Sequence, residues 1–134
     1  MIPKFRAWHK ETQTMLDVSL IDFKKSVLVG EHWEFGETNF INFDDVNLMQ
    51  STGLFDKNGK EIFDGDILTD GHTTGDIRNH PTLGFYTVDE SSKEGYLSDT
   101  VGIGDFEEAK EFMRNSIEVI GNIYENPELL EVEE

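Results

Sequence analysis

The sequence predicts a mainly β protein, α+β at the margin. We expect a small bent antiparallel sheet or partly open β-barrel of about six to nine strands, with one α-helix in the C-terminal half. Short apolar runs alternate with polar residues through the first half of the chain. Asn58-Gly59 separates two apolar pairs, which is the strongest short-range signal for a β-hairpin. Residues 105–115 carry the one convincing helical pattern.

The rest of the predicted fold is arranged around a central hairpin at Asn58-Gly59. A type I′ turn needs φ > 0 at both central residues, and Asn58-Gly59 suits it. With these two residues as the loop, Asp56 faces Glu61, and the apolar pairs 54–55 and 62–63 fix the register. Asp64-Gly65-Asp66 then turns the chain into a third extended run at residues 67–68, so the sequence predicts a meander.

Before this meander, the chain reads as a succession of short strands. Five segments have the alternation or the compact apolar content of strands: Ile2–Trp8, Met15–Ile21, Val27–Val29, a stretch around Gly36 with Trp33 and Phe35, and Phe40–Phe43. Residues 44–49 fit either one helical turn or an extended connector, and the sequence does not separate the two.

After the meander, residues 69–104 are rich in Thr, Gly, Asp and Ser, and we interpret them as loops around one strand at 83–88. Asp105 can cap the helix at 105–115, with Glu108 completing a capping-box pair. Phe106, Ala109, Phe112 and Met113 would then form its apolar face. A closing strand at 117–124 and a short acidic tail at 128–134 complete a single domain, 1–134.

Three blocks of sequence resemble one known family. They are Lys4-Phe5-Arg6-Ala7-Trp8, residues 49–67 (Met-Gln-x-Thr-Gly-Leu-x-Asp-Lys-Asn-Gly-Lys-Glu-Ile-x-x-Gly-Asp-Ile) and residues 118–130 (Glu-Val-Ile-Gly-Asn-Ile-Tyr-Glu-Asn-Pro-Glu-Leu-Leu). In this order they resemble the YopX family of bacteriophage and prophage proteins, whereas residues 69–117 match much less well. The resemblance implies a phage origin and a mostly β fold, and it brings no established activity.

The chain is strongly acidic, and the charge is uneven. The net charge is −17; residues 1–30 hold five basic and three acidic side chains, whereas residues 31–134 hold six basic and 25 acidic ones. The negative electrostatic field of so many carboxylates disfavours direct binding to nucleic-acid backbone and to anionic membranes. It permits a basic protein partner or mimicry of a nucleic acid. The absence of cysteine excludes disulfides and thiolate chemistry.

Two patterns could indicate a ligand site. Gly102-Ile103-Gly104 begins like a dinucleotide fingerprint, but Glu107 stands at the place of the third glycine and would repel a pyrophosphate. The second pattern is a cluster of carboxylates and imidazoles between residues 64 and 80, in which the weak metal candidates are Asp70, His72, Asp76 and His80. An acidic chain produces such clusters readily, so we predict no catalytic residue, no metal and no cofactor.

Three functions follow as hypotheses. The first is a non-enzymatic phage or prophage accessory protein that contacts an unknown host or phage protein. The second is an acidic nucleic-acid mimic that inhibits a host DNA-binding protein, and the third is a small metal-dependent hydrolase. Five aromatic residues could form a recognition surface, although aromatics on strands are usually core: Trp8, Trp33, Phe35, Phe43 and Tyr86. We expect a cytoplasmic protein of the bacterial host, without membrane contact, and homo-oligomerisation stays open.

Overall fold

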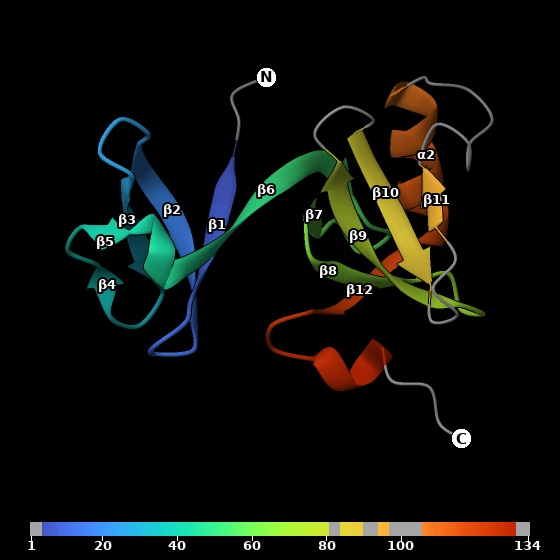
Figure 1. Cartoon of the computed structure of the whole chain (residues 1–134). Coiled ribbons are helices and arrows are strands. Elements are labelled where there is room, and N and C mark those ends of the chain that lie inside the picture. Colours follow the sequence, from blue (N-terminus) through green and yellow to red (C-terminus); the bar gives the residue numbers. More distant parts are fainter. Residues whose placement is uncertain (1–3, 81–83, 90–93, 97–105, 131–134) are drawn as a thin grey trace. The chain divides into compact units, whose positions relative to one another are not determined.

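A computed structural model describes residues 4–80, 84–89, 94–96 and 106–130 (Figure 1). The chain divides into two compact units, Met1–Ser51 and Thr52–Glu134, called here the N-terminal unit and the C-terminal unit. That the whole chain folds as one cooperative domain stays a prediction. No helix among the described residues has the length and apolar character needed to cross a membrane.

The N-terminal unit is an antiparallel sheet made of successive hairpins. Strands pair in the order β4-β3-β2-β1-β6, and β5 also pairs with β3. The elements are β1 (Phe5–His9), β2 (Thr14–Asp22), β3 (Val27–His32), β4 (Gly36–Glu37), β5 (Ile41–Asn42), the 3₁₀ turn η1 (Phe43–Asp45) and the first part of β6 (Val46–Phe55).

The core of the N-terminal unit forms where β1, β3 and β6 meet. Ala7, Leu28 and Val46 are buried there, and Val18, Ile21, Ile41, Phe43 and Leu48 pack against them. Ala7 stands opposite Leu16 on β2 and Leu48 on β6, so the central strand has apolar neighbours on both sides. Each of the five predicted segments contains a strand, but the one around Gly36 is limited to β4, and residues 2–3 of the first lie outside the described residues. Residues 44–49 contain both predicted alternatives in succession, because η1 ends at Asp45 and β6 begins at Val46.

The C-terminal unit contains a second antiparallel sheet with the order β11-β10-β9-β8-β12, while β7 pairs with β6 in the first sheet. Its elements are β7 (Glu61–Phe63), β8 (Asp66–Thr69), β9 (Thr74–His80), β10 (Gly84–Asp89), β11 (Glu94–Tyr96), α2 (Phe106–Ser116), β12 (Glu118–Asn122) and the 3₁₀ turn η2 (Pro127–Leu130).

Helix α2 closes the core of the C-terminal unit. Met113 and Ile117 are buried with strand residues Leu54, Ile62, Leu68, Ile77 and Val119, and Phe112 packs against this cluster. The predicted helix and its use of Phe112 and Met113 are therefore confirmed. The proposed cap Asp105 lies outside the described residues. The mainly β prediction is also confirmed, and within the described residues neither sheet closes into a barrel.

The central hairpin is present, but its predicted turn type and register are wrong. The Gly59 N–H donates to the Asp56 carbonyl at 3.0 Å, and the Asp56 N–H donates to the Lys60 carbonyl at 2.9 Å. Gly59 has φ +80°, whereas Asn58 is not among the residues with positive φ. These features define a type I turn over Lys57-Asn58 followed by a left-handed glycine. Asp56 consequently faces Lys60 rather than Glu61.

The stretch 69–104 holds more strand than the sequence predicted. The expected strand at 83–88 corresponds to β10, and β9 and β11 pair with it on either side. β9 also pairs with β8 through Leu68 opposite Gly75. Composition concealed β9 because it contains Gly, Asp and Asn, which are depleted in strands, whereas here pairing with two neighbouring strands supports them.

Candidate functional site

Three strongly exposed aromatic side chains lie in one continuous segment of the chain, which begins directly after β3. Trp33 is 89% exposed, Phe35 75% and Phe40 66%. They belong to residues 33–40, Trp-Glu-Phe-Gly-Glu-Thr-Asn-Phe, which we call the edge segment. It includes β4, which pairs with β3 through Glu37 opposite Glu31. Exposed aromatic side chains on ordered backbone are typical of surfaces that bind another molecule.

The edge segment begins with a turn that His32 holds. The His32 Nδ1 accepts hydrogen bonds from the backbone N–H of Glu34 at 3.1 Å and of Phe35 at 3.3 Å. In the neutral ring these bonds place the proton on Nε2. The imidazole also stacks on Phe35, with ring centroids 4.6 Å apart, and lies 5.6 Å from Trp33. The aromatic side chains are thus exposed, but the backbone that carries them is fixed.

Thr38 fixes the second half of the edge segment to β3. Its N–H donates to the Gly30 carbonyl at 2.8 Å, and the Gly30 N–H donates to the Thr38 hydroxyl at 3.0 Å. This hydroxyl donates in turn to the Asn39 carbonyl at 2.8 Å. A threonine side chain thereby takes the place of a strand carbonyl, and it leaves the chain free to diverge from β3 before Phe40.

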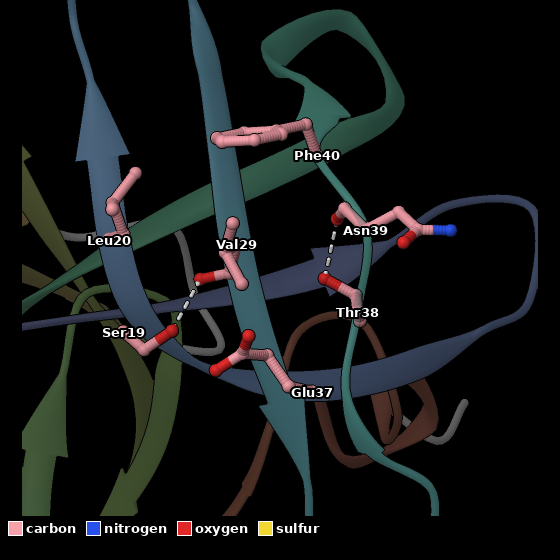
Figure 2. Close-up of a pocket in the computed structure, with 7 residues that line it drawn as sticks. All are labelled: Ser19, Leu20, Val29, Glu37, Thr38, Asn39 and Phe40. Carbon is pink, nitrogen blue, oxygen red and sulfur yellow. Dashed lines mark hydrogen bonds between the residues drawn. The ribbon is translucent and has the colours of Figure 1, made fainter.

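A groove opens between β2, β3 and the edge segment (Figure 2). It encloses about 490 Å³, and its walls come from Ser19, Leu20, Val29, Glu37, Thr38, Asn39 and Phe40. Leu20 and Val29 face each other across the strand pair, and the Ser19 hydroxyl donates to the Val29 carbonyl at 3.2 Å. In Figure 2 the apolar side chains gather at one end, and the Glu37 carboxylate lies at the other.

A second hollow of about 330 Å³ borders the same segment. Its walls come from His9, Thr12, Thr14, Leu16, His32, Phe35, Gly36, Glu37, Thr38 and Ile41. Because alternate residues of a strand face opposite sides, His32 and Val29 put the two hollows on opposite faces of β3. Both border Glu37 and Thr38, so the edge segment is accessible from both faces of the sheet.

Sequence reasoning named two of the three exposed aromatic residues of the edge segment and missed the groove. Phe23, which is 68% exposed and lies outside that segment, was not named either. Trp33 and Phe35 belonged to the proposed recognition surface, although the default expectation for them was a core position. Trp8 and Phe43 from the same set are partly buried, and the side chain of Tyr86 lies outside the described part of the structure. Gly36, with φ +80° between Phe35 and Glu37, was the available signal for a turn that leaves aromatic side chains outside the sheet.

The metal candidates are engaged in local structure. The Asp70 Oδ1 accepts bonds from the N–H of His72 and of Thr73, each at 2.8 Å. These two bonds lower the pKa of Asp70 below its ordinary value, and the bond from the Thr73 N–H has the larger effect. Asp76 is 2% exposed, and its Oδ2 accepts the Arg78 Nε–H at 2.6 Å. The side chain of His80 lies outside the described residues. In the part of the chain described, no three His, Asp or Glu side chains group as a metal would require.

The metal hypothesis has a direct test. Millimolar Mg²⁺, Mn²⁺ or Zn²⁺ is expected to leave the melting temperature unchanged, because Asp70 and Asp76 already satisfy protein donors. A site in the native state would instead add about 2.7 kcal/mol of stability at a hundredfold excess over Kd. Differential scanning fluorimetry measures the shift. A saturable rise that disappears in Asp70→Ala or His72→Ala would establish the metal site.

The blocks that carry the family resemblance meet in the C-terminal unit. Asp56 and Gly65 come from the block 49–67, and Val119 and Ile123 from the block 118–130. The Asp56 Oδ2 accepts the Val119 N–H at 2.9 Å, and the Gly65 carbonyl accepts the Ile123 N–H, also at 2.9 Å. These contacts join β12 to the hairpin and to the turn before β8. Residues 49–67 and 118–130 thus contact each other and together stabilise the C-terminal unit.

Fold and site together define a small mainly β protein with two antiparallel sheets and an exposed aromatic edge. The chain belongs to the YopX protein family, whose model matches residues 4–131. It is also similar to protein EF1440 from Enterococcus faecalis, known from a crystal structure. The two are 31% identical over 98% of this chain and 99% of that chain, with a TM-score of 0.64. No curated protein matches the chain.

Proposed function

We propose that this chain is a non-enzymatic accessory protein of a phage or prophage that acts by binding another protein through the edge segment. The observation that carries the proposal is the exposure of Trp33, Phe35 and Phe40 on one fixed stretch of backbone. Aromatic side chains are enriched at protein interfaces, where a few of them carry most of the binding energy. A surface already ordered before binding also loses little conformational entropy.

The groove supports the same function. Leu20, Val29 and Phe40 offer an apolar recess next to the exposed segment, and its volume suits one or two large side chains of a partner. Anchor residues in protein interfaces fill such recesses. The buried carboxylates of the C-terminal unit favour a role without catalysis, because Asp56 and Asp66 accept backbone N–H groups and Asp76 pairs with Arg78.

The acidity of the C-terminal unit favours a second candidate, the nucleic-acid mimic. Thr52–Glu134 holds six basic and 20 acidic side chains, whereas Met1–Ser51 holds five basic and eight acidic ones. A mimic would use this negative charge, and ion pairs would dominate its binding. Such pairs weaken as the screening length falls from about 10 Å at 0.1 M salt to about 3 Å at 1 M.

The test compares capture of host proteins by three forms of the full chain. The first is unmodified, the second carries Trp33→Ser, Phe35→Ser and Phe40→Ser, and the third carries Ile120→Ser and Leu129→Ser. Ile120 and Leu129 are exposed apolar residues of the C-terminal unit and serve as the control. We expect a partner that the first and third forms retain at about 1 M salt, and that the second form loses.

Two outcomes would count against the proposal. Equal capture by all three forms would place the contact elsewhere on the chain. A DNA-binding protein that elutes at moderate salt and that DNA displaces would establish the mimic instead. Folding of each variant is checked by circular dichroism, so that loss of capture is not confused with loss of structure.

A further inference from the structure

We infer that the edge segment binds a cationic side chain, arginine above all, in a basic stretch of its protein partner. This inference rests on the proposed function and names the chemistry of the partner. It begins from the distribution of charge: no Lys or Arg occurs between Lys25 and Lys57. Within that interval Glu31, Glu34 and Glu37 are all exposed. The segment therefore presents aromatic rings among carboxylates, with no lysine or arginine from its own stretch of sequence.

These three carboxylates are not neutralised within the described residues. The ion pairs found among the described residues join Lys57 to Glu118 and Arg78 to Asp76. Both pairs lie in the C-terminal unit. Glu34 lies between Trp33 and Phe35, and Glu37 forms part of the walls of both hollows. An incoming cation would thus find negative charge at the turn and along β4. Charge complementarity of this kind selects partners and speeds their association, whereas apolar contact with the aromatic side chains and the groove, which salt does not screen, keeps the complex together at high salt.

The exposed aromatic rings also attract a cation. A cation over the face of Trp, Tyr or Phe is attracted by the ring quadrupole, and Trp gives the strongest attraction. Trp33 is 89% exposed, and Phe35 is held against His32 by stacking. The hydrogen bonds from Glu34 N–H and Phe35 N–H to His32 keep the turn in place before any ligand arrives.

Arginine fits this surface better than lysine. Its planar guanidinium can stack on an aromatic face while its N–H groups bond a carboxylate, whereas the ammonium of lysine is compact and strongly hydrated. The apolar stem of arginine would lie on the exposed rings. A neighbouring apolar residue of the partner could then enter the groove formed by Leu20, Val29 and Phe40.

The experiment selects peptides from a random library with the full chain as bait. Sequences enriched by the unmodified protein are expected to combine Arg or Lys with a large apolar residue. One enriched peptide is then labelled with fluorescein, and its affinity is measured by fluorescence anisotropy. Replacing its arginines by citrulline, which is neutral and of similar shape, is expected to weaken binding by about tenfold or more.

Variants of the protein locate the contact. Trp33→Ala is expected to weaken binding by about tenfold, and Glu34→Gln with Glu37→Gln by about three- to tenfold. The matched control, Glu111→Gln with Glu128→Gln, removes the same charge from exposed positions of the C-terminal unit and is expected to change affinity by less than about twofold. His32→Ala is expected to weaken binding because the turn loses both acceptor bonds.

The possible failures separate the inference from the proposed function. Enrichment of neutral apolar peptides whose binding Trp33→Ala abolishes would overturn the cation and keep the edge segment as the binding surface. Basic peptides that respond to the Glu111 and Glu128 control but not to Trp33→Ala would move the contact to the C-terminal unit and overturn both. Failure to enrich any peptide at the edge segment would also overturn both.

Discussion

Asp56→Ala is expected to lower the free energy of unfolding by at least about 3 kcal/mol. The carboxylate is 1% exposed and accepts three backbone N–H groups: Lys60 at 2.8 Å, Asn58 at 2.9 Å and Val119 at 2.9 Å. The first two close the hairpin turn, and the third joins the turn to β12. Alanine leaves all three donors without their acceptor, and burial keeps water from replacing it at the Val119 N–H.

The same residue makes stability depend on pH. Burial raises the pKa of Asp56, but the N–H groups of Val119, Lys60 and Asn58, with the charge of Lys60, outweigh burial and lower it below the ordinary value of 3.8. Because the folded-state pKa is the lower one, the ionised carboxylate stabilises the fold fully above the unfolded-state pKa. This contribution is lost as the pH falls through the folded-state pKa. The difference in stability between the unmodified chain and Asp56→Asn should therefore narrow below about pH 4.

Urea unfolding followed by two probes measures the effect and also tests the single-domain prediction. Both tryptophans, Trp8 and Trp33, lie in the N-terminal unit, so their fluorescence reports that unit, whereas circular dichroism reports both. For one cooperative domain, Asp56→Ala lowers the midpoint by the two probes equally. Asp70→Ala is the control, because Asp70 makes similar bonds in an exposed loop. Equal losses for the two variants would contradict the role assigned to Asp56.

Asp56 also explains how far the central hairpin could be predicted. Local sequence located the turn, because Asn-Gly between apolar pairs has few other interpretations. The turn type depends on Asp56, whose Oδ1 accepts the N–H of Asn58 and of Lys60 and thereby favours the type I turn. Its bond to Val119 crosses 63 positions of sequence. No local pattern reveals such a contact, so the register shifted by one residue from the prediction.

Burial of aromatic residues was the other point at which sequence patterns were insufficient. Strand aromatics are usually core, and the partial burial of Trp8 on β1 and of Phe43 in η1 follows that expectation. Trp33 and Phe35 differ because β3 ends at His32, and the chain turns at the edge of the sheet instead of crossing it. Whether another strand covers the edge of a sheet depends on how the strands are connected, which local sequence does not reveal. Helix α2, in contrast, was predictable because its 3.6-residue period is entirely local.

Gly59→Val is expected to destabilise the C-terminal unit by about 1–3 kcal/mol. Gly59 has φ +80°, a region that β-branched residues adopt only with strain, and no atom beyond its two chain neighbours lies within 4 Å of the position of an added Cβ. Any loss therefore reflects backbone conformation alone and not a steric clash. Gly59→Asn is the matched variant, because asparagine tolerates a left-handed backbone far better than valine. Chemical denaturation should then place Gly59→Asn between the unmodified chain and Gly59→Val. Equal losses for Asn and Val would contradict the turn as described, since space and exposure are the same for both.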